Sequence, residues 1–329
     1  MSINLTCIFD DIASTENLLD AWSEFIKGKR GKADVQEFSM RLMDNIFLLH
    51  RELASRTYKH GPYQPFNICD PKPRNIHKAL VRDRLLHHAL YRKLYPFFNR
   101  TFIADSYSCR TNKGTHKALD RFSVFARKVS RNHTKTAWVL KCDIRKFFAN
   151  IDHLILLDVL GYSIPNRDIM RLLREVIASF CSTRLGIGLP LGNLTSQLFV
   201  NIYMNEFDRF VKHALKAHYY IRYADDFAIL SDNRAWLEGA RASIREFLRK
   251  RLRLELHPEK VFIKTAASGV DFLGWIHFPN HRVLRTSTKR RMLKRIATHP
   301  APETVGSYLE LLRHGNGVKI KQQIAALLL

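Results

Sequence analysis

The sequence predicts an α+β fold, in which helices interleave with strands and some strands pair as antiparallel hairpins. Apolar residues recur at helical spacing in several segments, and short β-type runs stand between these segments. Two of the runs are separated by turn and acidic residues, as in a hairpin. These patterns favour α+β over a doubly wound parallel sheet, and the sequence contains no internal repeat or low-complexity segment.

The N-terminal part is predicted to be helical with one pair of strands. Apolar residues at helical spacing from Val35 to Leu53 predict an amphipathic helix, preceded by a basic turn at Lys27–Lys32. Residues Gly61–Pro73 alternate apolar and turn residues, which predicts two short strands joined by a polar loop. Another helix is expected over Arg82–Phe98.

In the middle of the chain, a strand over Ala137–Cys142 runs into Asp143. Two β-type runs, Tyr219–Tyr223 and Phe227–Leu230, flank Ala224-Asp225-Asp226 and predict a hairpin with acids at its tip. The remaining expected elements are helices at His153–Leu160 and Arg167–Phe180, a Gly-rich turn at Leu185–Gly192 that opens a helix to about Leu215, a helix at Trp236–Leu252, a strand near Val261–Lys264, and basic helices after Trp275.

Charge and composition narrow the class of function. The 329 residues include 54 Lys and Arg against 30 Asp and Glu, a formal charge of +24 that indicates a polyanionic partner. With 46% apolar residues the chain can form a real core, which excludes a disordered or collagen-like protein. The apolar runs are shorter than the ~18 residues of a membrane span, and Asp10 and Asp11 interrupt any export signal, so we expect a cytoplasmic protein that does not bind membranes.

The five cysteines and fifteen histidines are dispersed, without zinc-site spacing, so neither a zinc site nor a disulfide framework is expected.

Three acidic residues indicate a different kind of metal site. Asp225 and Asp226 repel each other at the predicted tip unless a cation or proton neutralises them. Together with Asp143, they have the chemistry to hold two metal ions ~3.5–4 Å apart. The alternative is a turn pair plus a capping residue.

These residues resemble the catalytic core of reverse transcriptases. Tyr223-Ala-Asp-Asp226 lies between two β-type runs, and it follows Asp143 and the Phe147-Phe148 pair. The family's successive blocks appear in order. They are Arg82–His88, Ser106–Gly114, Lys141–Phe148, Gly188–Gln197, Tyr223–Asp226, His257–Lys260 and Phe272–Trp275. The resemblance implies a right-hand polymerase fold, with an N-terminal extension and fingers over residues 1–140, a palm over 137–275 with finger helices interleaved near 160–185, and a compact basic helical thumb over 276–329.

The fourth block points to one branch of this family. Most members carry Gln-Gly and Ser-Pro there, whereas this chain has Leu191-Gly192 and Ser196-Gln197. That departure resembles the reverse transcriptases of diversity-generating retroelements, and Ser307–Asn316 resembles the end of their compact thumb. The resemblance implies an error-prone RNA-directed DNA polymerase that copies a template-repeat RNA into cDNA for mutagenic retrohoming. The alternatives are a retron-type or antiphage reverse transcriptase, and a nucleic-acid-binding protein that keeps the polymerase fold without catalysis.

The resemblance also implies the catalytic residues. Asp143, Asp225 and the backbone of Ile144 would bind two Mg²⁺ ions, which Mn²⁺ can replace, and Asp226 would support the primer end or the metals. Lys260 matches a position proposed to protonate the leaving pyrophosphate, with an exposed lysine as the plainer interpretation.

Further residues are expected around the nucleotide and the nucleic acid. Phe148 would lie under the incoming sugar, and Leu191 replaces a glutamine that hydrogen-bonds near the nascent pair. The other nucleotide-binding candidates are Lys72, Arg74, Arg110, Gly192 and Gln197. The primer-grip candidates are Phe272, Leu273 and Gly274, and the expected backbone contacts are Lys289, Arg290, Arg291, Lys294 and Arg295, with Arg249–Arg253 in a second basic helix. The expected partners are template RNA, the RNA/DNA hybrid, dNTPs and a small basic accessory protein.

Overall fold

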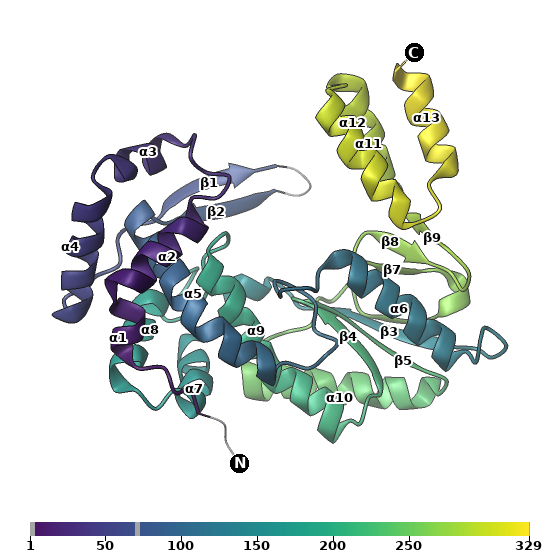
Figure 1. Cartoon of the computed structure of the whole chain (residues 1–329). Helices are drawn as coiled ribbons and strands as arrows, with labels where there is room; N and C mark the ends of the chain where they lie inside the picture. The colour runs from purple at the N-terminus through teal and green to yellow at the C-terminus, as the bar shows by residue number, and fades with distance from the viewer. Residues whose placement is uncertain (1–3, 70–72, 329) are drawn as a thin grey trace. The chain divides into compact units, whose positions relative to one another are not determined.

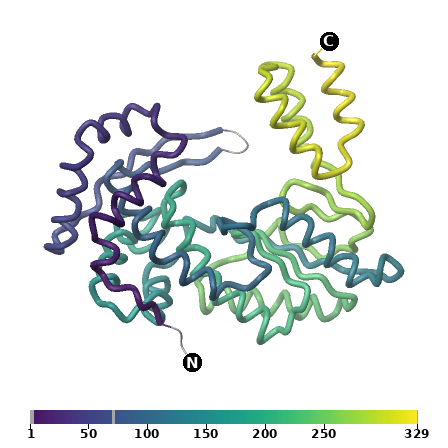
Figure 2. Tube along the Cα trace, in the orientation of Figure 1, coloured from purple at the N-terminus to yellow at the C-terminus, as the bar shows by residue number. Residues whose placement is uncertain are grey.

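The computed structural model describes residues 4–69 and 73–328, which divide into two compact units. Each unit is built from stretches that are distant in the sequence, as the colours of the trace in Figure 2 show. The first unit comprises Met1–Ala104, Lys146–Phe210 and Phe247–Glu255. The second comprises Asp105–Arg145, Val211–Glu246 and Leu256–Leu329. Helices and antiparallel sheets interleave along the chain, so the expected α+β class is confirmed.

The first unit is mainly helical, with one antiparallel hairpin (Figure 1). Helix α5 buries a continuous apolar stripe that includes Leu85, Ala89 and Leu90, and it packs against α2. Asn17 joins the two helices, because its buried Nδ2 donates to the carbonyl of Ala89 at 3.3 Å. The elements of this unit are α1 (Phe9–Ala13), α2 (Thr15–Phe25), α3 (Ala33–Met40), α4 (Leu42–Ala54), β1 (Gln64–Ile68), β2 (Arg74–Lys78), α5 (Val81–Thr101), the short 3₁₀ helix η1 (Phe147–Asn150), α7 (His153–Ser163), α8 (Arg167–Ala178) and α9 (Leu194–Arg209).

The single helix expected over Val35–Leu53 is two helices. Arg41 interrupts it with backbone angles φ −123° and ψ 43°, which are not helical. The Nδ2 of Asn45 donates to the carbonyl of Phe38 at 3.0 Å, and so satisfies a group that the break leaves without its helical partner. Apolar spacing continues across the break, which explains why periodicity alone predicts one helix.

The second unit is organised around a four-stranded antiparallel sheet in the order β4-β5-β3-β6 (Figure 1). Its strands are β3 (Trp138–Asp143), β4 (Tyr219–Tyr223), β5 (Asp226–Ser231) and β6 (Phe262–Thr265). The other elements are α6 (Thr115–Val129), the π-type turn η2 (Phe210–Ala214), α10 (Arg234–Leu252), the 3₁₀ turn η3 (Ala266–Ser268), β7 (Val270–Phe272), β8 (Trp275–His277), β9 (Arg282–Leu284), α11 (Thr286–Thr298), α12 (Pro302–Leu311), the 3₁₀ turn η4 (Leu312–His314) and α13 (Val318–Leu328). The end of α10, from Phe247, belongs to the first unit. Helix α9 ends at Arg209, before the Leu215 that the pattern predicts, because η2 replaces its last turn.

The register of this sheet decides which side chains share a face. Val139 pairs with Leu230 and Lys141 pairs with Ala228, while Asp143 pairs with Asp226. Directly opposed residues point to the same side of a sheet, so these pairs lie on one face. Val139, Ala228 and Leu230 belong to one apolar core with residues of α6, including Phe122 and Phe125. The acids therefore lie at the end of a face that is otherwise mostly apolar.

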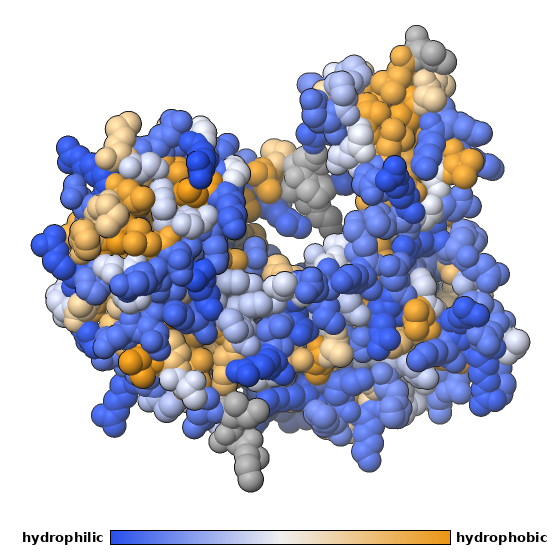
Figure 3. All heavy atoms as spheres, viewed as in Figure 1, coloured by the Kyte–Doolittle hydropathy of each residue, from blue (hydrophilic) through white to orange (hydrophobic). Residues whose placement is uncertain are grey.

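A three-stranded sheet, β7-β8-β9, leads into the C-terminal helices α11, α12 and α13 (Figure 1). Strand β9 differs from the all-helical end that the sequence predicts, because residues 282–284 pair with β8. Gly315 lies against the indole ring of Trp275, where any Cβ would collide with it. The C-terminal helices bury Met292, Ile296 and Ile320. Figure 3 shows hydrophobic side chains gathered over these helices, and the exposed apolar residues there include Leu309 and Val318. None of the helices within residues 4–69 and 73–328 combines the length and the apolar character needed to cross a membrane.

Candidate active site

Three acidic residues lie at one end of the four-stranded sheet. Asp143 is the last residue of β3 and pairs directly with Asp226, the first residue of β5. Asp225 lies in the two-residue turn between β4 and β5, where Ala224 has a positive φ of 55°. The backbone N–H of Ile144 donates to the carbonyl of Asp225 at 3.1 Å and fastens this turn beside β3. The predicted strand, hairpin and acidic tip are thus confirmed as secondary structure.

The acids have perturbed protonation. Burial raises the pKa of Asp225, and the neighbouring charge of Asp143 raises it further. Burial also raises the pKa of Asp226 to about 6, although the nearby ammonium group of Lys141 opposes this shift. Both shifts mean that added negative charge is costly here, so the site favours a positively charged partner.

Two lysines already supply positive charge. Lys141 lies two residues before Asp143 on the same face of β3, and its buried ammonium group forms an ion pair with Oδ1 of Asp226. The Nζ of Lys260 is 3.1 Å from Oδ1 of Asp143, and this side chain is 45% exposed. Lys141 is thus enclosed by the fold, whereas Lys260 reaches the carboxylate from the surface.

The segment that carries Lys260 is anchored to the end of β3. The backbone N–H of His257 donates to the carbonyl of Asp143 at 2.7 Å, and that of Lys260 donates to the carbonyl of His257 at 3.3 Å. Ile144 and Leu256 form an isolated antiparallel bridge next to these bonds. The contact between Lys260 and Asp143 therefore rests on fixed backbone.

The donor chemistry of this site suits a hard divalent cation. Asp143 and Asp225 offer carboxylate oxygens, which Mg²⁺ and Mn²⁺ prefer as ligands. In the part of the chain that the structure describes, however, no three His, Cys, Asp or Glu side chains are grouped closely enough to hold a metal ion as they stand. In this arrangement Lys141 pairs with Asp226, and Lys260 pairs with Asp143.

Phe272, Leu273 and Gly274 form a tight hairpin turn between β7 and β8. Phe272 pairs with Trp275, and the two residues between them have positive φ values of 51° and 86°. Such a turn suits the close backbone approach expected of a primer grip. Phe272 itself is fully buried, and the Nζ of Lys141 lies 5.7 Å from the centre of its ring. Its side chain therefore supports the site from within the core.

The loop that carries Arg110 is attached to β4. The backbone N–H of Tyr107 donates to the carbonyl of Arg222 at 2.9 Å, and Ser106 forms a parallel bridge with Arg222. The Nη1 of Arg110 donates to the carbonyl of Ser106 at 2.9 Å, so part of the guanidinium braces its own loop. Sequence reasoning did not predict this attachment.

The remaining nucleotide-binding candidates belong to the first unit. Phe147 is buried and Phe148 is half-buried, so one ring of the tandem packs in the core and the other is partly exposed. The backbone N–H of Leu189 donates to the carbonyl of Phe148 at 2.8 Å, which links η1 to the Gly-rich turn. Arg74 is an exposed residue at the start of β2, and Gln197 is half-buried on α9. The candidate Lys72 lies outside the described residues.

Strand β2 supports the turn at Leu191 and Gly192. The backbone N–H of His77 donates to the carbonyl of Leu191 at 3.2 Å, and Nδ2 of Asn193 donates to the carbonyl of His77 at 3.1 Å. Gly192 has a φ of 100°, and a Cβ there would lie 2.9 Å from Cγ2 of Ile76. Glycine is therefore required at this position by both the backbone angle and the close approach of β2.

The basic helices differ in how their charges are used. On α11, Met292 and Ile296 are buried, and the exposed cations of the same helix include Arg290, Lys294 and Arg295, with Lys289 and Arg291 half-buried. In the second cluster, Nη1 of Arg253 lies 2.6 Å from Oδ2 of Asp152, a buried residue that caps α7. Arg253 is thus held by an internal acid, and the expectation of a phosphate contact is weaker there than on α11.

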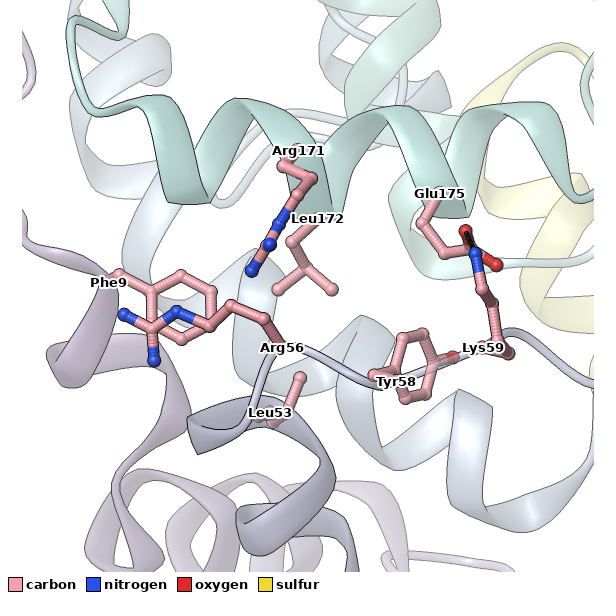
Figure 4. A pocket seen from close by; sticks show the side chains of 8 residues that line it. All are labelled: Phe9, Leu53, Arg56, Tyr58, Lys59, Arg171, Leu172 and Glu175. Carbon is pink, nitrogen blue, oxygen red and sulfur yellow. Dashed lines mark hydrogen bonds and ion pairs between the residues drawn. The ribbon is translucent and has the colours of Figure 1, made fainter.

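A small cavity in the first unit does not have the size or the free charges of a ligand-binding site. It has a volume of about 70 Å³, below the ~300 Å³ of typical ligand sites. Figure 4 shows the side chains of Arg56 and Lys59 among its lining residues. Arg56 stacks on Phe9 at 4.3 Å and pairs with Asp168, and Lys59 pairs with Glu175. Its charges are already compensated within the protein.

An antiparallel sheet with paired acids at one strand end is the arrangement expected of a nucleic-acid polymerase palm. The family model described as "Reverse transcriptase (RNA-dependent DNA polymerase)" matches residues 69–277. The chain therefore belongs to the reverse transcriptase family, whose members are RNA-directed DNA polymerases.

Individual curated proteins are also similar to this chain. Protein YkfC of Escherichia coli (strain K12) is 25% identical, over 79% of this chain and 76% of its own length. The group II intron-encoded protein LtrA of Lactococcus lactis subsp. cremoris is 22% identical, over 85% of this chain and 54% of its own length. The chain thus spans about half of LtrA.

Solved structures show the same fold. The telomerase of Candida albicans, in complex with the TWJ fragment of telomeric RNA, has a TM-score of 0.53 at 12% identity, covering 82% of this chain and 55% of that one. Apo telomerase of Candida tropicalis, truncated from the C-terminal domain, has a TM-score of 0.51 at 13% identity, covering 71% and 59%. The expected polymerase fold is confirmed.

Proposed function

We propose that this chain is the reverse transcriptase of a diversity-generating retroelement, which copies a template-repeat RNA into error-prone cDNA for mutagenic retrohoming. The observation that supports polymerase activity is the pairing of Asp143 with Asp226, beside the turn that contains Asp225. The retroelement role is supported by Leu191-Gly192 and Ser196-Gln197, where most family members carry Gln-Gly and Ser-Pro. Its partners would be the template RNA, the RNA/DNA hybrid, dNTPs and a small basic accessory protein.

In this proposal, Asp143, Asp225 and the backbone carbonyl of Ile144 hold Mg²⁺, with Mn²⁺ as a possible substitute. The bound ions would activate the primer hydroxyl and neutralise charge on the leaving pyrophosphate. Asp226, held by Lys141, supports the primer end. Lys260, at hydrogen-bond distance from Asp143, donates a proton to the departing pyrophosphate.

The other candidates bind and orient the substrates. Arg74, Arg110 and Lys72 attract the triphosphate and template phosphates, and Phe148 disfavours a sugar with a 2′-hydroxyl. The turn of Phe272, Leu273 and Gly274 brings backbone to the primer end. The cations of α11 lie along duplex phosphates, which they recognise by charge and not by base.

Low fidelity follows from the side chain at position 191. Leucine can neither donate nor accept a hydrogen bond beside the nascent pair. Loss of one such contact, worth ~1 kcal/mol, reduces discrimination between correct and incorrect pairs by roughly fivefold to tenfold. The carbonyl of Leu191 accepts a bond from His77, so the backbone is fixed and the side chain is the variable feature.

The test is primer extension on an RNA template with dNTPs and Mg²⁺, followed by sequencing of the cDNA. We expect full-length cDNA with errors concentrated opposite template adenines. An Asp158→Asn protein, which loses an exposed acid of α7 outside the carboxylate site, should give the same cDNA yield as wild type. Efficient cDNA synthesis with few errors, evenly spread over the four bases, would contradict the retroelement role and favour a retron-type or antiphage enzyme.

A further inference from the structure

A second polar pocket lies in the same unit as the carboxylates, at the end of strands β4 and β5 that is opposite to the acids. Tyr219 begins β4 and Ser231 ends β5, and both line the pocket, whereas Tyr223 and Asp226 are at the acidic end. Four residue steps at ~3.3 Å place the two ends of β4 about 13 Å apart. The pocket has a volume of about 520 Å³, which is large enough for one nucleotide.

The rim of this pocket is basic. Its lining residues include the exposed cations Lys128, Arg131 and Lys216 together with His218. Among the described lining residues, Asp232 is the single acid. Within residues 4–69 and 73–328, no acid forms an ion pair with any of these three Lys and Arg side chains. Their charge is therefore available to an anionic ligand.

The loops that carry the cations are held by internal hydrogen bonds. The Nζ of Lys212 donates to the carbonyls of Ala217 and His218, at 3.1 and 2.9 Å, and so closes the loop that presents Lys216. On the other side, the backbone N–H of Lys135 donates to the carbonyl of Ser130 at 2.8 Å across the loop of Arg131. The backbone that carries Arg131 and Lys216 is thus fixed before any ligand binds, which lowers the entropic cost of binding.

Aromatic and apolar side chains complete the pocket. The half-buried rings of Tyr219 and Trp236 line it, together with Val129, Leu215 and Leu230. Trp236 lies in the first turn of α10, where its backbone N–H donates to Oδ1 of Asn233 at 2.9 Å. Aromatic rings beside uncompensated cations are the combination that binds single-stranded nucleic acid, because bases stack on rings while phosphates meet the charges.

We propose that this pocket is a second RNA-binding site, which takes one unpaired nucleotide of a single-stranded segment outside the template–primer duplex. A base would stack against Trp236 and Tyr219, with its phosphates at Lys128, Arg131 and Lys216. Asp232 would accept a hydrogen bond from a base N–H group, such as the N3–H of uracil. The site rests on the proposed function in one respect, namely that the bound RNA belongs to the molecule being copied. Such a contact would hold a long template on the enzyme during synthesis.

The experiment separates this site from the active site. Full-length protein is first saturated with an unlabelled template–primer duplex, and then a fluorescent eight-nucleotide oligouridylate is added and its binding followed by anisotropy. We expect the double variant Arg131→Glu and Lys216→Glu to bind the oligonucleotide at least about 10-fold more weakly than wild type, with a smaller salt dependence. A control variant, Lys32→Glu with Arg174→Glu, has the same net charge and changes exposed cations of the other unit. It should bind nearly as wild type does.

Two further measurements fix the nature of the ligand. Photo-crosslinking with a 4-thiouridine oligonucleotide should label the peptides that contain Tyr219 or Trp236, and unlabelled single-stranded RNA should compete better than duplex RNA. Equal weakening in the control variant, or equal competition by duplex RNA, would overturn the proposal. Variants that bind RNA normally but lose an accessory protein would also overturn it and assign the pocket to a protein partner.

Failure of this inference and failure of the proposed function give different results. Extension of a short oligonucleotide template depends on the carboxylates and should persist in the Arg131→Glu and Lys216→Glu protein. Its absence in wild type as well would contradict the proposed function, while the anisotropy measurement would still report on the pocket.

Discussion

The buried ammonium group of Lys141 forms an ion pair with the carboxylate of Asp226, on the strand next to its own. The register explains the contact, because Lys141 pairs with Ala228 and Asp143 pairs with Asp226, which makes Lys141 and Asp226 diagonal neighbours on one face. Phe272 lies beneath the same ammonium group. A cation at this point fixes one carboxylate of the site and opposes the binding of a second cation there.

Replacing Lys141 should separate these two effects. We expect Lys141→Met to bind Mn²⁺ roughly tenfold more tightly in the absence of nucleic acid, since removal of a nearby charge relieves about 1–2 kcal/mol of repulsion. Primer extension should fall, because Asp226 loses its fixed position, and Lys141→Arg should recover most of it. Electron paramagnetic resonance of free Mn²⁺ measures the affinity. Unchanged Mn²⁺ affinity, with equal loss of activity in both variants, would mean that Lys141 serves only the packing of the sheet.

At Leu191, a glutamine should improve fidelity slightly. Leu191→Gln would add a donor and an acceptor beside the incoming nucleotide, and we expect a gain in discrimination of order 1 kcal/mol, largest opposite template adenine. Sequencing of cDNA made by both proteins from one template measures this. If error rates are identical at all four bases, the leucine only packs, and infidelity arises elsewhere.

For the cations of α11, salt dependence is the informative measurement. Lys289→Ala with Arg290→Ala should weaken RNA and hybrid substrates alike, and should reduce the slope of log affinity against log salt by up to ~1 for each lost phosphate contact. Binding of two hybrids of unrelated sequence, each measured at several salt concentrations, tests this. A loss confined to one sequence, with an unchanged slope, would show that these side chains do not contact the backbone.

Acid should destabilise the fold through buried histidines. Burial lowers the pKa of His277 to about 3, that of His87 to about 3 and that of His88 to about 4. Below pH 6.5 these histidines bind protons in the unfolded chain but stay neutral in the folded protein. The free energy of unfolding is therefore retained above pH 6.5 and falls as the pH drops toward 3. Each histidine contributes a slope of up to about 1.4 kcal/mol per pH unit.

The variant His277→Phe tests this assignment. Its ring can keep the packing against Phe122, and the bond given up is the 3.3 Å contact between Nδ1 and Ser123. Urea denaturation at pH 7.0 and 5.5 should show a smaller acid-induced loss for the variant than for wild type, by about 1 kcal/mol. An identical loss in both proteins would place the acid sensitivity elsewhere.

Much of the fold could be predicted because its signals are local. The hairpin around Asp225, the strand before Asp143 and helix α8 follow from apolar periodicity and turn residues. Helix α6 is not among the predicted helices, although Leu119, Phe122 and Ala126 have helical spacing. The break at Arg41 depends on the side chain of Asn45, which periodicity does not report.

The site was predictable in its residue types but not in its contacts. Period-two alternation places Lys141 on the face of Asp143, yet its ion pair with Asp226 depends on the register between β3 and β5. The support of Leu191 by His77 joins residues far apart in the sequence. The basic pocket likewise combines the loops of Arg131 and Lys216, and neither loop carries a recognisable motif. These relationships are set by tertiary structure.

The most direct test of the central claim is primer extension by Asp225→Asn on an RNA template with Mg²⁺. The substitution is isosteric, so the fold and RNA binding should remain nearly intact, as circular dichroism and a gel-shift assay would report. We expect cDNA synthesis below ~1% of wild type, because the metal clamp supplies several kcal/mol of the rate enhancement. Synthesis above ~1% of wild type by the folded Asp225→Asn protein would contradict the assignment of these carboxylates as the polymerase active site.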